Sequence, residues 1–336
     1  MHRTRAAFAA LAAVVLVLVA IGCGGTSDAA GGDGKLTLVA YSTPQEAYQE
    51  IIPAFNETSA GKGIKFTQSY GASGEQERAV EGGLKADVVA LSLAPDIDKL
   101  VKAGLVDSTW TSAPYDGFVT DSVVVFEVRK GNPENIRTWD DLAGPGVDVI
   151  SPNPFTSGGA KWNIMAAYGS QTTTGKSDAQ AQDYLSKLFK NVSVLDKSAR
   201  EAQQTFTSGK GDVLIAYENE AITAQRKGED VDYVIPDQTI LIQNPAAATT
   251  DSKNPDKAKA FLDFLRTDAA QKIYAGHGYR SVKPSLVDKS KFTTPSGLFE
   301  ITKFGGWSKV NDEFFDPSSG KVAKIFQSQG KTTASG

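Results

Sequence analysis

The stretch Thr156-Ser157-Gly158-Gly159-Ala160-Lys161-Trp162 lies between a strand-like run at 147–152 and an amphipathic run at 161–168. A hydroxyl and two glycines at the start of a helix form a good anion receptor. The first-turn N–H groups have no intrahelical partner, glycine lets a ligand approach the backbone, and the helix dipole favours negative charge. Taken alone, the pattern is more often an ordinary helix cap followed by a tight turn. Its meaning therefore depends on whether the chain repeats it.

From Lys35 onward, short apolar runs alternate with amphipathic runs. Several apolar runs, such as Asp-Val-Val-Ala-Leu-Ser-Leu at 87–93, are continuously hydrophobic, as expected for a parallel sheet covered on both faces. The alternation predicts an α/β fold built from βαβ units. We expect strands at 36–41, 64–70, 86–93, 122–129, 147–151, 212–217 and 240–242. We expect helices at 45–55, 76–84, 95–103, 179–189, 199–206, 255–266 and 269–275.

The 336 residues are enough for two domains with buried cores. The best crossing points between them are 116–120 and 243–246, because each adjoins a strand pattern. These crossings predict two α/β lobes with a cleft between them. The first lobe is expected to comprise 35–120 and 246–336, the second 121–242, and the hinge crossing 243–245.

The N-terminus has the pattern of a targeting segment. Arg3 and Arg5 precede an uninterrupted apolar run at 6–21, and the only cysteine, Cys23, follows directly after it. Because this run is short for a membrane span and ends in small residues, residues 1–22 are predicted to be a signal peptide. Ala-Ile-Gly-Cys at 20–23 resembles a bacterial lipobox, which predicts lipidation of Cys23; a chance cysteine after an ordinary signal is the alternative. Residues 23–34, rich in Gly, Ala and Ser, are expected to be a flexible tether.

The composition narrows the class of ligand. The formal net charge is −4, which argues against a nucleic-acid partner, since such proteins carry a basic patch. An anion must then be held by local donors rather than by the field of the whole protein. With no cysteine besides Cys23, the mature chain has no disulfide or cysteine-based metal site. We expect no cofactor and no metal.

The hydroxyl-and-glycine pattern recurs at three further strand-to-helix junctions. They are Tyr41-Ser42-Thr43-Pro44, Tyr70-Gly71-Ala72-Ser73-Gly74 and Leu195-Asp196-Lys197-Ser198-Ala199-Arg200. In open α/β sheets, ligands bind at the carboxyl ends of strands, beside such helix starts. The four junctions together therefore predict a single anion site.

The predicted site consists of donors without dedicated acceptors. Backbone N–H groups and serine hydroxyls can surround an anion while helix dipoles disperse its charge, without a lysine or arginine to cancel it. Such a cavity suits a fully ionised tetrahedral oxyanion. A phosphate that keeps a proton needs an acceptor, and each buried mismatch costs about 1–3 kcal/mol.

Several longer motifs extend the pattern from Leu36 to about Arg280. They are Ser-Tyr-Gly-Ala-Ser-Gly-Glu-Gln at 69–76, Ala-Asp-Val-Val-Ala-Leu-Ser-Leu at 86–93, Val-Arg-Lys-Gly-Asn-Pro at 128–133, Thr-Trp-Asp-Asp-Leu at 138–142, Ser-Pro-Asn-Pro-Phe-Thr-Ser-Gly-Gly-Ala-Lys-Trp-Asn at 151–163 and Asp-Val-Leu-Ile-Ala-Tyr-Glu-Asn-Glu at 212–220. Together they resemble the sulfate- and thiosulfate-binding proteins of bacterial sulfate ABC importers. The resemblance implies a two-lobed periplasmic-binding-protein fold of type II, each lobe a mostly parallel sheet flanked by helices, with the ligand in the interlobe cleft.

The resemblance also implies roles for single residues. Ser73 and Ser157 match hydroxyl donors of the family, and Gly158, Gly159 and Ala199 match backbone N–H donors. Ser42 stands where the family usually has an aspartate that contributes its main-chain N–H, so serine should preserve the contact. Tyr217 stands where the family commonly has a tryptophan that donates its indole N–H. The tyrosine O–H can also donate a hydrogen bond, but it reaches a different point in the site and can accept one as well. Sulfate is therefore the expected ligand, and thiosulfate, molybdate and phosphate are alternatives.

These expectations describe a monomeric, lipid-anchored extracytoplasmic receptor that delivers sulfate to an ABC importer permease with its ATPase. The protein itself is expected to catalyse nothing. A serine hydrolase is the rival from another class, but His277 is the one histidine of the mature chain, and Gly-Ala-Ser-Gly at 71–74 misses nucleophile-elbow spacing. A lipoprotein that binds a protein partner and no small ligand is a third possibility, which leaves the four helix starts without a purpose.

Overall fold

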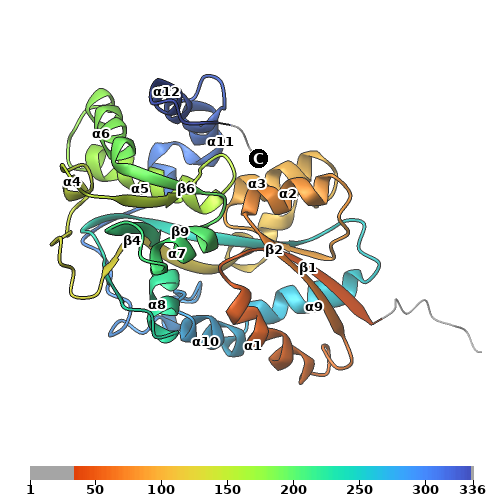
Figure 1. Ribbon diagram of the computed structural model, residues 1–336. Coiled ribbons are helices and arrows are strands. Elements are labelled where there is room, and N and C mark those ends of the chain that lie inside the picture. The colour runs from red at the N-terminus through yellow and green to blue at the C-terminus, as the bar shows by residue number, and fades with distance from the viewer. Residues whose placement is uncertain (1–33, 334–336) are drawn as a thin grey trace, which may run out of the picture. The chain divides into compact units, whose positions relative to one another are not determined.

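The computed structural model describes residues 34–333, in which strands and helices alternate along the chain (Figure 1). The strands are β1 (Lys35–Tyr41), β2 (Lys65–Gly71), β3 (Val88–Ala90), β4 (Phe118–Arg129), β5 (Val149–Pro152), β6 (Val192–Asp196), β7 (Val213–Tyr217), β8 (Val231–Val234), β9 (Gln238–Ala248) and β10 (Gly297–Phe299). The α-helices are α1 (Gln45–Asn56), α2 (Ser73–Glu81), α3 (Ala94–Lys102), α4 (Trp139–Leu142), α5 (Gly158–Thr173), α6 (Asp178–Asn191), α7 (Ala199–Thr207), α8 (Glu218–Arg226), α9 (Pro255–Leu265), α10 (Asp268–Gly276), α11 (Gly306–Val310) and α12 (Lys321–Ser328). Short 3-10 or π turns lie at 110–112, 114–117, 284–286, 301–304 and 311–315. The predicted α/β class is confirmed.

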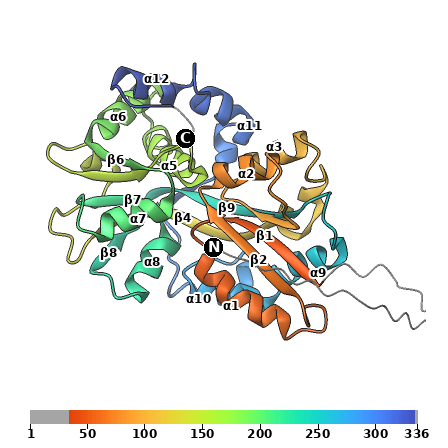
Figure 2. The ribbon, with the colours of Figure 1, turned by 45° about the vertical axis from the view of Figure 1, so that its right-hand side comes forward.

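The strands form one continuous hydrogen-bonded path in the order β2-β1-β3-β9-β4-β7-β5-β6, with β10 added beside β9 and β8 beside β4. At one end of the path, β1 is parallel to both β2 and β3. At the other end, β5 is parallel to both β6 and β7. Within the path, the central strands β9 and β4 are antiparallel to their neighbours and to each other, whereas the added strand β10 is parallel to β9. Two parallel sets are therefore joined through a pair of long antiparallel strands (Figure 2).

The two central strands are longer than the sequence pattern predicts. The first part of β4 pairs with β9 and its second part with β7, while the last residues of β9 pair with β3. Polar residues at 243–244 and the proline at 245 end the hydrophobic pattern, yet they lie inside β9. The strand accommodates them because the buried Asn244 amide donates to the carbonyl of Ser92, at 2.9 Å. Residues 243–245, where the sequence predicts a crossing between the lobes, lie within β9.

One hydrophobic core lies beside β1 and the end of β9. Helices α1, α9 and α10 contribute Tyr48, Phe55, Phe261 and Tyr274 to it, and these rings pack edge-on or tilted against one another. The same three helices lie together in Figure 1. Burial of such aromatic side chains is the main stabilising contribution that this part of the chain can make.

A second core surrounds α5 and α6, and the C-terminal segment 297–328 belongs to it. Trp307 stands edge-on to Trp162 of α5, with ring centroids 4.6 Å apart. Phe326 of α12 packs in the same way on Phe189 of α6, at 4.8 Å. Figure 1 accordingly shows α12 beside α6. The chain's end therefore packs against the middle of the sequence, far from the residues that precede it.

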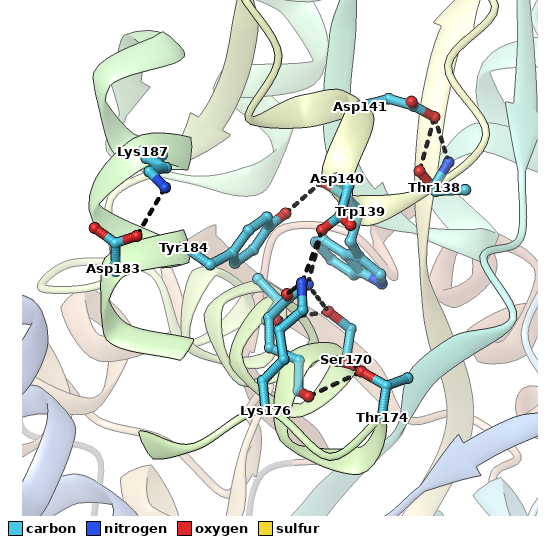
Figure 3. A network of polar contacts seen from close by, with 12 residues as sticks. Thr138, Trp139, Asp140, Asp141, Ser170, Thr174, Lys176, Asp183, Tyr184 and Lys187 are labelled. Atoms are coloured by element: carbon cyan, nitrogen blue, oxygen red, sulfur yellow. Dashed lines mark hydrogen bonds and ion pairs between the residues drawn. The ribbon is translucent and has the colours of Figure 1, made fainter. Parts of the chain in front are cut away.

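Polar contacts fix α4 against α5 and α6 (Figure 3). The Tyr184 hydroxyl donates to the Trp139 carbonyl at 2.5 Å, and Lys176 lies 3.5 Å from the Asp140 carboxylate. Thr138 caps α4, because its N–H donates to the Asp141 carboxylate at 2.7 Å. This network joins α4 to α6 and to the C-terminal end of α5.

Candidate functional site

One small cavity brings together six of the seven residues predicted to bind a ligand. It contains about 240 Å³ of empty space. Within residues 34–333, no charged side chain lines it. Its walls are Tyr41, Ser42, Thr43, Gly71, Ala72, Ser73, Ser92, Ser157, Gly159, Ala199 and Tyr217. We call it the site cavity; of the predicted set, Gly158 alone is not in the wall itself.

The sheet topology explains why these residues meet. Strands β1 and β2 are parallel and end at Tyr41 and Gly71, so their carboxyl ends lie at one edge, where α1 and α2 begin. Strands β5, β6 and β7 likewise end together, beside the starts of α5, α7 and α8. Each parallel set brings its strand ends to the cavity, as the rule for open α/β sheets requires.

The start of α5 presents free donors to the cavity. Ser157 is the N-cap, and its hydroxyl oxygen accepts the Ala160 N–H at 3.4 Å, which leaves its own proton available. The amides of Gly158 and Gly159 belong to the first turn, where the helix offers no acceptor. Glycine is needed at 158, because an added Cβ there would lie 1.9 Å from Leu93 Cδ2 and 2.2 Å from Ser92 Oγ.

The start of α2 is built differently. The Ser73 hydroxyl donates to the buried Asp96 carboxylate at 2.7 Å and accepts the Ser92 N–H at 3.0 Å. This differs from the expectation that Ser73 contributes a hydroxyl donor to the ligand. The reason is Asp96, on α3. The folded chain places its carboxylate beside Ser73, where it accepts the hydrogen bond of the hydroxyl. The Ser73 amide, at the first position of α2, remains a first-turn donor.

Ser42 and Ala199 line the cavity from two different strand-to-helix junctions. Ala199 is the first residue of α7, whose N-cap Ser198 exchanges bonds with Glu201 in a capping box. Ser42 lies in the turn between β1 and α1, and its carbonyl accepts two bonds from Arg200, at 3.2 and 2.9 Å. The guanidinium is therefore held by the Ser42 carbonyl and the Glu46 carboxylate, and it does not line the site cavity.

Tyr217, the last residue of β7, places its hydroxyl in the cavity wall. The side chain is 1% exposed, and burial raises the pKa of its hydroxyl well above the usual value, so the proton is retained. Ser92 and Asn244 lie near enough to lower that pKa slightly, but within residues 34–333 the hydroxyl makes no hydrogen bond. It lies close to the start of α5: an added Cβ on Gly159 would be 3.5 Å from it.

Five wall residues were not among the predicted ligand-binding residues; Tyr41, Thr43, Gly71 and Ala72 stand in the predicted junctions, and Ser92 lies outside them. Ser92 lies within the predicted strand 86–93, but β3 covers only Val88–Ala90 and the chain then turns toward α3. Tyr41 is the final residue of β1 and is 6% exposed. A serine between a hydrophobic strand and a Pro95 helix start repeats the pattern of the other junctions, and that signal could have identified Ser92.

A larger cavity adjoins the first at Thr43 and contains about 710 Å³ of empty space. Five charged residues line it, and we call it the charged cavity: Glu46, Arg200, Glu220, Lys227 and Glu229. Burial alone would raise the pKa of Glu46, but hydrogen bonds from Arg200 and Lys227 lower it to about 2. Glu220 is deeper, and burial raises its pKa to about 7 although it accepts the Tyr217 N–H at 3.0 Å.

Other candidate chemistry lies away from the site cavity. His277 is buried beside Glu50, with its Nε2 2.9 Å from the carboxylate, and does not line the cavity. In the described part of the chain, no cluster of three or more His, Cys, Asp or Glu side chains is placed to hold a metal ion.

Comparison with known proteins agrees with this geometry. Residues 36–280 match the family described as bacterial extracellular solute-binding protein. A sulfate-binding protein from Synechococcus elongatus is 44% identical over 321 residues, covering 91% of this chain and 92% of the relative. A thiosulfate-binding protein from Pseudomonas aeruginosa is 34% identical over 314 residues, covering 89% and 94%.

Among solved structures, the sulfate-binding protein SubI from Mycobacterium tuberculosis H37Rv superposes with a TM-score of 0.82. It is 44% identical, and the match covers 84% of this chain and 99% of SubI. The predicted two-lobed periplasmic-binding-protein fold of type II is thereby confirmed. The chain belongs to the bacterial extracellular solute-binding proteins.

Proposed function

We propose that this protein is the sulfate receptor of an ABC importer, which captures the dianion between its lobes and presents it to a membrane permease with its ATPase. The observation that carries the proposal is the site cavity, in which helix-start amides and hydroxyls converge and no charged side chain of the described chain takes part. The relatives named sulfate-binding protein support the choice of anion. Members of this family are solute-binding proteins, and we assign the protein no catalytic step.

In this proposal, the anion is held by donors alone. The amides of Ser42, Ser73, Gly158, Gly159 and Ala199 donate from the helix starts, where the dipoles favour negative charge. The hydroxyls of Ser157 and Tyr217 complete the set. Ser73 is assigned its amide rather than its hydroxyl, because the hydroxyl is bonded to Asp96.

Thiosulfate is the alternative that a specific observation favours. Its shape differs from sulfate by one larger atom, and a relative of this chain is named a thiosulfate-binding protein. The hydroxyl of Tyr217 makes no hydrogen bond within residues 34–333 and could adjust to either anion. Molybdate and phosphate remain alternatives of lower rank, phosphate because its retained proton has no dedicated acceptor in the cavity wall.

We propose that closure of two lobes over the anion produces the form that the permease recognises. Lobe 1 comprises 35–120 together with the chain after the 243–245 crossing, and lobe 2 comprises 121–242. The aromatic contacts of 297–328 with α5 and α6 support moving that segment from lobe 1 to lobe 2. Bonds from Arg200 to Ser42 and from Trp162 to Ser92 would then link the lobes in the closed form.

We also propose that the receptor acts as a monomer anchored outside the cytoplasm by a lipid on Cys23. Residues 1–33, which contain the signal peptide and most of the tether, lie outside the described part of the chain. Between residues 34 and 333, no helix has the length and hydropathy required to cross a bilayer. Cys23→Ser should abolish incorporation of a labelled fatty acid and leave sulfate affinity unchanged. Label still attached to the variant would contradict the lipobox assignment.

Calorimetric titration of the full chain tests the function directly. Sulfate, thiosulfate, molybdate and phosphate would each be titrated at pH 6 and pH 8. Tight sulfate binding that is nearly independent of pH, with no heat from phosphate, is expected of a donor-only dianion site. Preference for phosphate or molybdate would mean that Tyr217 and its neighbours select another oxyanion, and silence from all four would contradict a receptor of this class.

A further inference from the structure

Ser92 carries a hydroxyl that lies beside the Tyr217 hydroxyl, and neither of the two makes a hydrogen bond within residues 34–333. It lies in the turn between β3 and α3, is 1% exposed and lines the site cavity. Its Oγ makes no hydrogen bond with any group of residues 34–333. A buried hydroxyl without a partner destabilises a protein, so a serine kept in such a place needs a reason.

The backbone of Ser92, by contrast, is fully bonded. Its N–H donates to the Ser73 hydroxyl at 3.0 Å. Its carbonyl accepts the Trp162 indole N–H and the Asn244 amide, both at 2.9 Å. Elements on three sides therefore fix the position of Ser92, while its hydroxyl stays free to turn into the cavity.

The Ser92 hydroxyl lies at the side of the cavity where α5 begins. An added Cβ on Gly158 would approach its Oγ to 2.2 Å, and an added Cβ on Gly159 would be 3.5 Å from the Tyr217 hydroxyl. These two hydroxyls, both fully buried and both unbonded among the described residues, thus lie beside Gly158 and Gly159 at the start of α5. Each can donate one proton to an anion, whereas the Ser73 hydroxyl is already bonded to Asp96.

We propose that Ser92 donates its hydroxyl to the bound anion and, together with Tyr217, sets the preference for sulfate over thiosulfate. This inference rests on the proposed function, since it assumes that the cavity holds one of these anions. Every donor around sulfate meets an oxygen. In thiosulfate one oxygen is replaced by a larger sulfur, which accepts hydrogen bonds weakly, so a crowded wall of hydroxyls favours sulfate.

Alanine at position 92 isolates the hydroxyl, because it retains the three backbone bonds. In calorimetric titrations of the full chain, Ser92→Ala should weaken sulfate binding by about 5- to 150-fold. Thiosulfate binding should weaken less. The substitution removes a donor, but it also makes room for the larger sulfur atom, and this second effect offsets part of the loss. The melting temperature of the ligand-free protein should stay the same or rise, since an unpaired buried hydroxyl has been removed.

Ser122→Ala is the matched control. Ser122 is equally buried, but its hydroxyl donates to Asn219 at 2.9 Å and does not line the site cavity. That variant should lose thermal stability and keep both affinities. If Ser92 had only a structural role, Ser92→Ala would likewise lose thermal stability and keep both affinities. That result is the opposite of the one expected for Ser92→Ala.

Ser157→Ala separates failure of this inference from failure of the proposed function. Wild-type protein that binds neither anion would overturn both. If the wild type binds sulfate and Ser157→Ala weakens it, but Ser92→Ala does not, the site assignment stands and the role of Ser92 is refuted. An equal loss of both anions in Ser92→Ala would refute its role in selectivity.

Discussion

The site cavity and the charged cavity share Thr43, yet they differ completely in charge. Strand ends and helix starts line the first cavity, whereas α7, α8 and the residues after α8 line most of the second. Within residues 34–333, the walls of the first carry hydroxyls and amides only. The second carries three glutamates, an arginine and a lysine. If the site attracted anions by charge, Arg200 would line the site cavity. It lines the charged cavity instead.

The hydrogen bonds of Arg200 show how its charge is kept out of the site cavity. Although Arg200 follows Ala199 of the site cavity, its guanidinium bonds to Glu46 at 2.8 and 2.5 Å and to the Ser42 carbonyl. Its positive charge is thus largely neutralised outside the site. Fixed donors then decide which anion fits, and they discriminate by shape and protonation state, whereas a free cation would attract any anion.

The largest effect is expected when the amides of the site cavity are displaced. Gly158→Ala would force a Cβ into Leu93 Cδ2 and Ser92 Oγ, which lie 1.9 and 2.2 Å from its position. Sulfate affinity should fall by on the order of 3 kcal/mol, about 100-fold, because the start of α5 must shift. The measurement is calorimetric titration with sulfate.

Gly276→Ala is the control for that substitution, since nothing lies within 4 Å of its added Cβ and its backbone is ordinary. It should bind sulfate as the wild type does. Normal affinity in Gly158→Ala would show that the amides at this helix start do not hold the anion.

Much of the site cavity could be predicted because its donors are local features. A hydroxyl or glycine at a strand-to-helix junction is visible in the sequence, and βαβ topology brings such junctions to one edge. The start of α5 at Gly158, with Ser157 as N-cap, follows directly from the stretch 156–162. Ala199 at the first position of α7 is a second example.

What could not be predicted depends on contacts between distant segments. The Ser73 hydroxyl is bonded to Asp96, 23 residues away, and nothing in the local pattern indicates that pair. The core contact of Phe326 with Phe189 is of the same kind. Strand β6 (Val192–Asp196) was also missed, because it is short and half-exposed and lacks a continuous hydrophobic run. Sequence periodicity records which face is buried, but not which distant segment covers it.

Glu220 of the charged cavity provides a second test, through the pH dependence of stability. The folded-state pKa of Glu220 is about 7, above its ordinary 4.5, because burial disfavours the charge. A raised pKa contributes stability that is present below pH 4.5 and is lost as the pH rises through 7. In Glu220→Gln this loss is absent, so the variant should gain on the order of 2–3 kcal/mol relative to wild type between pH 4.5 and 8.

Urea unfolding across this pH range measures the difference. Asp121 and Glu127 also have raised pKa values through burial, but they are present in both proteins and cancel. Glu134→Gln, at an exposed position, is the control and should follow the wild-type curve at a constant offset. Parallel curves for Glu220→Gln as well would mean that Glu220 is charged at pH 6, and the two cavities would then differ in charge even more than the structure indicates.

The smallest effect is expected from the charge that lies nearest the site. Arg200→Gln removes the guanidinium beside Ser42, but that charge is already paired with Glu46, and about a quarter of each side chain is exposed to solvent. Sulfate affinity should therefore weaken by less than about 1 kcal/mol, and the loss should shrink further at high salt. Titrations at low and high ionic strength measure both. A loss greater than tenfold that vanishes in salt would show that the anion is held by charge after all, and the distinction between the two cavities would fail. A loss that is small at low salt and smaller at high salt would mean that the site cavity selects its ligand with neutral donors, while the charged residues next to it only hold the walls in place.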